Sequence, residues 1–141
     1  MMFLPDVNLW LALAFNQHVH HAAAKSWFDT VPDQAACFCR LTQQGFLRLA
    51  TNRKAFGEET VSLSEAWRLY DAFLDDPRIV FAEEPTGLEP LWRHYTQKES
   101  FSPKVWSDAF LAAFAQAAAY DLVTFDKGFK AYSDVNRTIL E

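Results

Sequence analysis

The chain has 141 residues, of which half are apolar, so it is long enough to bury one sizeable core without disulfide bonds or structural metals. Its 13 Lys and Arg residues against 18 Asp and Glu residues give a net charge of −5, which argues against binding nucleic acid by bulk electrostatic attraction alone. We therefore expect a single domain over residues 1–141, and any contact with nucleic acid to be local and assisted by a metal ion.

The chain opens with an apolar strand and two helices. Met2–Pro5 is a short apolar run typical of a buried strand, and Val7–Phe15 is apolar nearly all round, which predicts a buried helix. The alanine-rich segment Val19–Val31 predicts a second helix that ends before Pro32. A second strand is expected over Ala35–Cys39.

The middle of the chain is mainly helical in pattern. The apolar positions of Leu41–Thr51 predict a helix, and the polar stretch Asn52–Glu59, which contains a glycine, predicts a loop. Ser62 and Glu65 have the spacing of a capping box, which marks the start of a further helix. That helix is expected to end at Asp75-Asp76-Pro77.

The second half returns to alternating strands and helices. The third and fourth strands are expected over Ile79–Ala82 and Leu122–Phe125, and Arg137–Leu140 is a candidate for a fifth. The helices between them run from about residue 86 to Tyr95 and over Lys104–Tyr120, the longest in the chain. This alternation predicts an α/β fold with a mostly parallel sheet of four to five strands, flanked by helices on both faces.

The cysteine content and the N-terminus indicate the compartment. Cys37 and Cys39 are the only cysteines, and no second Cys or His pair accompanies them at ligand spacing, so buried thiols are favoured over a metal pair. The N-terminus lacks the features of a signal peptide, and no uncharged stretch approaches the length of a membrane span. We expect a soluble, cytoplasmic protein.

Three aspartates fall where a parallel sheet collects ligand groups. Asp6 ends the first strand, Asp126 ends the fourth, and Asp108 lies in the first turns of the helix that precedes the fourth. Because the carboxyl ends of neighbouring strands lie along one edge, these side chains are expected to meet there. Two unit charges about 4 Å apart repel by roughly 4 kcal/mol at an effective dielectric near 20, so the group requires a cation or shared protons.

The ligand type narrows the metal and the reaction. All-oxygen carboxylate sites favour Mg²⁺ or Mn²⁺ over zinc, and such an ion can activate a water for hydrolysis of a phosphodiester. A plainer interpretation stays open for Asp6 and Asp126, since an aspartate after a strand is also a common helix cap or turn residue. Asp108 is harder to explain in this way, because it directly precedes the apolar run Ala109-Phe110-Leu111.

Three segments of the chain resemble the motif blocks of PIN-domain ribonucleases: Asp6–Ala14, Ser107–Ala115 and Leu122–Phe129. The resemblance covers nearly the whole chain and is closest to the VapC toxins of bacterial toxin–antitoxin modules. It implies a PIN-like fold and a magnesium-dependent endoribonuclease that a cognate VapB-like antitoxin neutralises. It also implies a homodimer.

The resemblance assigns roles to individual residues. Asp6 is expected to be the first metal ligand, Asp108 the second principal ligand, and Asp126 a weaker or water-mediated one. Asn8 and Thr124 resemble the polar residues that support these ligands through hydrogen bonds, although a helix-start residue and a strand residue are equally good explanations.

One departure from the family concerns the helix after the second strand, where the family usually places a glutamate. Residues 41–48 contain no carboxylate, and Gln44 or Gly45 falls at that place. A neutral amide can ligate or hold a water but lends no negative charge. We therefore expect one Mg²⁺ in the free protein, with a second ion arriving together with RNA.

Basic residues near the expected site are candidates for contacts with RNA phosphates, with Arg40 and Lys127 ranked first. The main rival to a ribonuclease is a non-catalytic PIN-fold module that binds RNA or protein, motivated by the missing glutamate. A phosphotransfer receiver domain is a weaker alternative, because the first strand ends in a single carboxylate and only Glu83-Glu84 follows the third.

Overall fold

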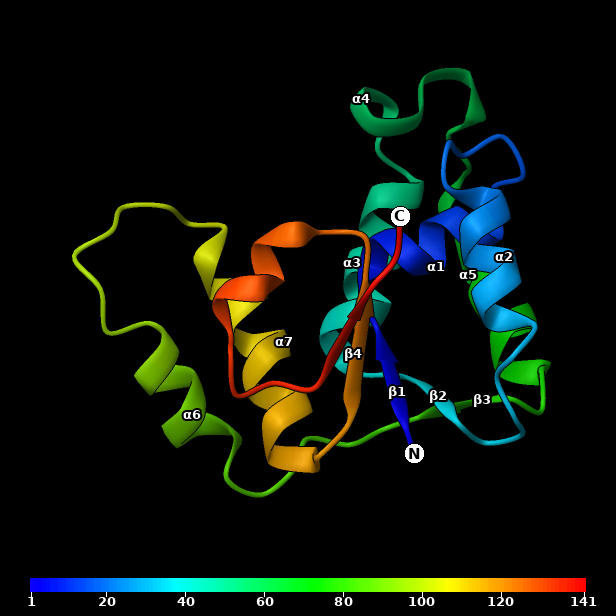
Figure 1. Cartoon of the computed structure of the whole chain (residues 1–141). Coiled ribbons are helices and arrows are strands. Elements are labelled where there is room, and N and C mark those ends of the chain that lie inside the picture. The colour runs from blue at the N-terminus through cyan, green and yellow to red at the C-terminus, as the bar shows by residue number, and fades with distance from the viewer.

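A five-stranded parallel sheet forms the centre of the protein, as the computed structural model of residues 1–141 shows (Figure 1). The strands are β1 Phe3–Pro5, β2 Ala36–Phe38, β3 Ile79–Phe81, β4 Asp121–Thr124 and β5 Arg137–Ile139, in the order β3-β2-β1-β4-β5. All pairs are parallel, and Pro5 at the end of β1 is paired with Val123 of β4. The residues that follow β1 and β4 therefore come out side by side at the carboxyl edge of the sheet.

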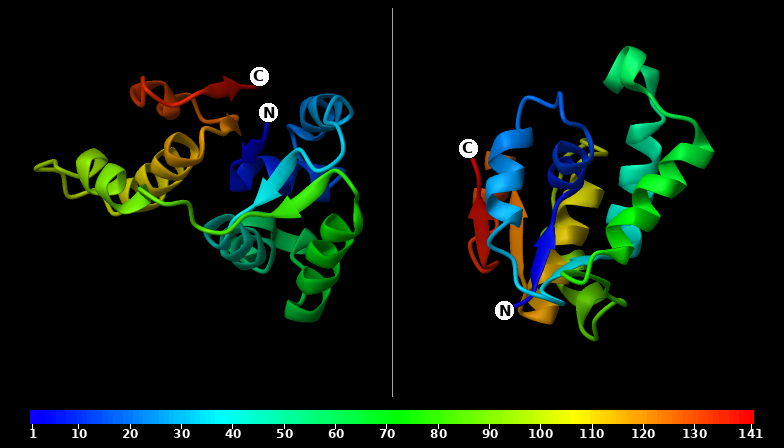
Figure 2. Two further views of the ribbon diagram at one scale, coloured as in Figure 1. Left: turned by 90° about the horizontal axis from the view of Figure 1, so that it is seen from below. Right: turned by 90° about the vertical axis from the view of Figure 1, so that its right-hand side faces the viewer.

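Seven helices surround the sheet: α1 Val7–Ala14, α2 His21–Phe28, α3 Arg40–Ala50, α4 Arg53–Phe56, α5 Leu63–Asp75, α6 Leu88–Tyr95 and α7 Val105–Ala118. Two short 3-10 helices, η1 Gly57–Glu59 and η2 Lys127–Ala131, complete the chain. Figures 1 and 2 show α6 and α7 on one side of the sheet and α1, α2 and α5 on the other. The α/β architecture expected from the sequence is confirmed. None of the helices is long and apolar enough to span a membrane.

The core lies on both faces of the sheet because successive strand residues point to opposite faces. On one face Leu4 and Leu122 pack with α7, and on the other Phe38 packs with helix residues such as Trp10, whose ring stacks on it at 3.9 Å between centroids. Cys37 is a free, buried thiol of the first face, and burial raises its pKa to about 12. Cys37 therefore acts as a small apolar core residue, as expected.

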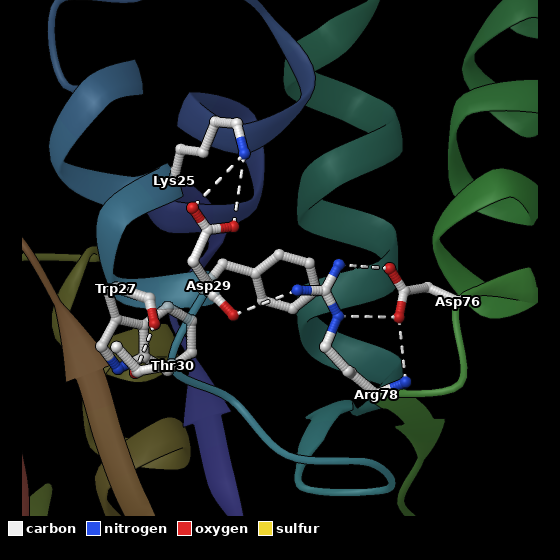
Figure 3. A network of polar contacts seen from close by, with 7 residues as sticks. Lys25, Trp27, Asp29, Thr30, Asp76 and Arg78 are labelled. Atoms are coloured by element: carbon white, nitrogen blue, oxygen red, sulfur yellow. Dashed lines mark hydrogen bonds and ion pairs between the residues drawn. The ribbon is translucent and has the colours of Figure 1, made fainter.

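An arginine after α5 fixes the outer edge of the sheet to α2 (Figure 3). Arg78 donates to both carboxylate oxygens of Asp76, at 3.0 and 2.7 Å, and to the carbonyl oxygen of Phe28 at 3.3 Å. Its guanidinium lies 3.9 Å from the centroid of the Phe28 ring. These contacts hold the start of β3, the edge strand, against the C-terminal end of α2.

Two local predictions were wrong. The segment Asn52–Glu59 is helical rather than a loop, because the Asn52 side chain caps α4 by accepting from the backbone N–H of Lys54 at 2.9 Å. The second helix is shorter than Val19–Val31 and begins only at His21. Before it, the chain makes a local turn in which the His18 ring accepts from the backbone N–H of His20 at 3.0 Å.

Candidate active site

Asp6 is fixed at the carboxyl edge of the sheet by two hydrogen bonds. It is the N-cap of α1, and its Oδ1 accepts from the backbone N–H of Val7 at 2.7 Å. Its Oδ2 accepts from the hydroxyl of Thr124, the last residue of β4, at 2.9 Å. The side chain that follows β1 is thereby tied to the neighbouring strand.

Thr124 also links Asp6 to Asp126. The fully buried Thr124 hydroxyl accepts from the backbone N–H of Asp126 at 2.9 Å, and Asp126 Oδ1 accepts from the N–H of Gly128 at 2.8 Å. Lys104, just before α7, places its Nζ 3.6 Å from Asp126 Oδ2. Asp126 therefore has partners on both carboxylate oxygens.

Asp108 approaches from the first turns of α7 and, unlike Asp6, makes no hydrogen bond through its side chain. Together the two carboxylates line a cavity of about 300 Å³, whose other polar side chains are Thr42, Gln44, Arg48 and Ser107. Asp126 lies near this cavity but is not part of its wall. The structure thus brings Asp6 and Asp108 to one cavity and keeps Asp126 beside it.

Burial and the charge of a neighbouring aspartate raise the pKa of both cavity carboxylates. Burial is the largest cause for Asp6 and for Asp108, and the negative charge of Asp126 adds to it in each case. The charge of Asp6 further raises the pKa of Asp108, whereas Lys104 lowers the pKa of both. A cation in the cavity would relieve this repulsion.

The side chains present suit Mg²⁺ or Mn²⁺ in chemical type but do not form a complete cage. Asp6, Asp108, the Gln44 amide oxygen and the Ser107 hydroxyl are all oxygen donors, which these ions prefer. No three Asp, Glu, His or Cys side chains of the protein form a group that could hold a metal ion by themselves. An ion in this cavity would therefore keep several waters, as Mg²⁺ usually does.

Comparison with known proteins places the chain in a family. A model of the PIN domain matches residues 3–135. Ribonuclease VapC41 of Mycobacterium tuberculosis is 49% identical over 144 aligned positions that cover 99% of both chains, and ribonuclease VapC38 of the same species is 32% identical over 90% of this chain and 86% of its own. The chain belongs to the VapC family of PIN-domain ribonucleases.

Solved structures agree with the fold expected of a VapC protein. DNA-bound VapBC from Salmonella typhimurium superposes with a TM-score of 0.70 at 14% identity, covering 99% of this chain and 98% of that one. VapC20 of Mycobacterium tuberculosis, described as a sarcin-ricin loop cleaving toxin, gives a TM-score of 0.67 at 17% identity over 92% and 93% of the two chains. At these identities the likeness is one of fold.

Gln44 and Gly45, which fall where a glutamate was expected from the family resemblance, have different surroundings in this VapC protein. Gln44 is exposed on α3 and reaches the cavity. Gly45 is buried, and a Cβ built on it would lie 2.6 Å from Cγ2 of Val7. The glycine therefore allows α3 to pack closely on α1, and Gln44 is the residue that offers an oxygen to the cavity.

The other residues chosen from the sequence lie outside the cavity wall. Asn8 is exposed on α1, and its side chain makes no hydrogen bond to another residue, in contrast to Thr124. Arg40 donates to Gln43 Oε1 at 2.5 Å, and its guanidinium lies 4.9 Å from the Phe81 ring centroid. Lys127 is exposed at the start of η2, next to Asp126.

Two basic residues lie closer to the carboxylates than their rank among the candidate phosphate contacts indicated. Lys104 contacts Asp126 and Arg48 lines the cavity, yet the sequence ranked both below Arg40 and Lys127 as candidates for phosphate contacts. Helical spacing would have indicated Arg48, since it lies four residues after Gln44 on the same face of α3. No local signal marks Lys104, because its partner is in a different element.

Proposed function

We propose that this VapC protein is a magnesium-dependent endoribonuclease that hydrolyses RNA phosphodiester bonds at the cavity between Asp6 and Asp108. The observation that carries the proposal is the shared cavity of these two carboxylates, each with a raised pKa, at the carboxyl edge of the sheet. The names of its relatives, ribonucleases VapC41 and VapC38, support the same reaction.

Bound Mg²⁺ would supply a Lewis acid that lowers the pKa of a water and stabilises charge on the phosphoryl oxygens. The chain itself supplies orientation. Thr124 and the N–H of Val7 hold both oxygens of Asp6, so that its carboxylate cannot rotate freely. Asp108 has no such partner and would be free to hold the ion or a water, while Arg48 is placed to attract a phosphate.

We further propose that the protein is the toxin of a toxin–antitoxin module, with a VapB-like antitoxin as its partner. Solved structures of the same fold include VapBC complexes from Salmonella typhimurium and from nontypeable Haemophilus influenzae, which supports this partner. A homodimer acting in the cytoplasm completes the proposal, in keeping with the family resemblance.

A non-catalytic module that binds RNA or protein is the second candidate, favoured by the neutral Gln44 in the cavity and by the lack of a three-membered ligand group. Incubation of the antitoxin-free protein with total bacterial RNA and Mg²⁺ distinguishes the two. If the protein is an enzyme, cleavage is lost when EDTA is added and when Asp108 is replaced (Asp108→Asn). Cleavage is retained by Asp71→Asn, a control at an exposed aspartate of α5. A folded wild type that leaves the RNA intact would favour the binding module.

A further inference from the structure

A second cavity lies at the N-terminal end of α7 and in the loop before it, adjacent in the chain to residues of the proposed active site. Its volume is about 250 Å³, and its walls include Phe101, Val105, Trp106 and Lys98. The next two residues of the chain, Ser107 and Asp108, line the cavity of the carboxylates. The first turn of α7 therefore contributes to both cavities.

The aromatic side chains of this second cavity are unusually open to solvent. Phe101 is 99% exposed and Trp106 is 58% exposed, although large aromatic rings gain most from burial. Phe101 lies in the loop between α6 and α7, and Trp106 lies in the first turn of α7. That loop extends away from the body of the protein (Figures 1 and 2). An exposed pair of rings next to a reaction centre indicates a binding surface.

Trp106 is held in place rather than loose. The indole N–H of Trp92 donates to the backbone carbonyl of Trp106 at 3.0 Å, and the two rings meet edge to face with 6.0 Å between centroids. Trp92 is itself packed on Phe110 of α7, at 5.2 Å. A braced ring with an open surface loses little side-chain freedom when a flat ligand stacks on it.

The polar groups of the cavity suit a nucleotide. Lys98 is the only charged residue of its wall, and the hydroxyls of Thr96, Ser100 and Ser102 accompany it. The one carboxylate in the adjoining depression, Glu89, is paired with Arg93 at 2.8 Å. Aromatic surface for a base, one cation for a phosphate and hydroxyls for a ribose are the features of single-stranded RNA binding.

We propose that Trp106 and Phe101 stack on an unpaired base of the RNA and so position the neighbouring phosphate at the cavity of Asp6 and Asp108. This inference rests on the proposed function for its substrate class. It adds a subsite to that function and explains how a protein of net charge −5 binds RNA, since stacking requires no basic surface.

Binding is measured by fluorescence anisotropy on the Asp108→Asn background, so that cleavage does not interfere. The probes are fluorescein-labelled single-stranded RNAs of A or of U, about ten nucleotides long, and an abasic strand of the same length. Trp106→Ala and Phe101→Ala should each weaken binding of the base-containing RNAs at least about 5-fold and leave binding of the abasic strand unchanged. Trp106→Phe should retain most of the affinity.

Trp67→Ala is the matched control, because Trp67 is 49% exposed on α5, which lies on the other side of the sheet (Figure 1). Phe101→Ala guards against misfolding, since a ring that is 99% exposed contributes almost nothing to the core. Equal RNA affinity in Trp106→Ala, Phe101→Ala and Trp67→Ala would overturn the proposal. Trp106→Ala and Phe101→Ala variants that lose antitoxin binding but keep their RNA affinity would also overturn it.

The failure of this subsite and the failure of the ribonuclease function give different results. If the wild type cleaves RNA and Trp106→Ala leaves its KM unchanged, the stacking subsite is wrong and the nuclease stands. If no protein cleaves RNA but the two aromatic variants still weaken binding of base-containing strands, the subsite stands and the catalytic function is wrong.

Discussion

The hydroxyl of Thr124 donates a 2.9 Å hydrogen bond to Oδ2 of Asp6, across 118 residues of sequence. The bond exists because β1 and β4 are parallel neighbours, with Pro5 paired to Val123. The same hydroxyl accepts from the backbone N–H of Asp126. One buried oxygen therefore sets the positions of two of the three acidic residues at this edge of the sheet.

Replacing Thr124 tests this link directly. Thr124→Val keeps the shape of the side chain but leaves Asp6 Oδ2 and the N–H of Asp126 without their partner, which should lower the free energy of unfolding by about 1–3 kcal/mol. Urea denaturation measures the change. Thr124→Ser retains the hydroxyl and should lose less, so equal stability of the two variants would contradict the proposed link.

Gly45 should be intolerant of even one added methyl group. Gly45→Ala places a Cβ 2.6 Å from Cγ2 of Val7, and this overlap should lower the free energy of unfolding by about 1–3 kcal/mol. Alanine in a helix would otherwise stabilise by about 0.5–1 kcal/mol, so the sign of the change is informative. Adding Val7→Ala should recover much of the loss, and independent effects of the two substitutions would argue against close α1–α3 packing at this point.

Gln44 offers a way to strengthen metal binding. Gln44→Glu adds a negative charge to the wall of the cavity, and at the distances of such a site we expect the Kd for Mg²⁺ to fall about tenfold. Isothermal titration calorimetry in the absence of RNA measures it. Gln34→Glu is the control, because Gln34 is exposed and precedes β2 at the opposite edge of the sheet. Equal gains in both variants would show that only net charge matters.

Two aspartates should respond to pH with opposite signs. Burial raises the pKa of Asp108, so the folded protein favours the protonated form and the ionised side chain destabilises it near pH 7. Asp108→Asn should therefore raise the Tm in EDTA, by roughly 3 °C for each kcal/mol, and this gain should shrink as the pH falls toward the ordinary aspartate pKa. Asp108→Asn less stable than wild type at pH 7 would contradict this.

Asp76 provides the comparison. The hydrogen bonds from Arg78 hold the pKa of Asp76 below its usual value. The ionised Asp76 side chain therefore stabilises the fold, and this stabilisation is fully present at pH values above the ordinary aspartate pKa. Asp76→Asn should lower the Tm at pH 7, and the difference from wild type should vanish as the pH falls through the lowered pKa. A loss that is independent of pH would assign the effect to packing rather than to the ion pair.

The order of strands and helices could be predicted from the sequence because apolar periodicity is local. For the same reason Asp6, Thr124 and Asp126 could be assigned to strand ends, and a parallel sheet then brings them together. The helical segment after Asn52 was missed because a single capping side chain outweighed a polar composition. Sequence patterns describe such short elements poorly.

Contacts between separate elements could not be predicted in this way. Arg40 stays a candidate for RNA phosphates, and no sequence pattern indicated that its guanidinium would lie over Phe81 of β3. Lys104 was ranked below Arg40 and Lys127, yet it reaches Asp126. Both placements depend on which residues the fold makes neighbours, and long polar side chains carry no periodic signal of that.

The most direct test of a metal-dependent nuclease at this cavity is the rate of RNA cleavage as a function of Mg²⁺ concentration, for the wild type and Asp108→Asn side by side. We predict saturable activation of the wild type, complete loss in EDTA, and a reduction of about 100-fold or more in Asp108→Asn at saturating Mg²⁺, with circular dichroism unchanged. Cleavage by the wild type that persists in EDTA, or an Asp108→Asn variant as active as the wild type, would contradict a metal-dependent nuclease at this cavity.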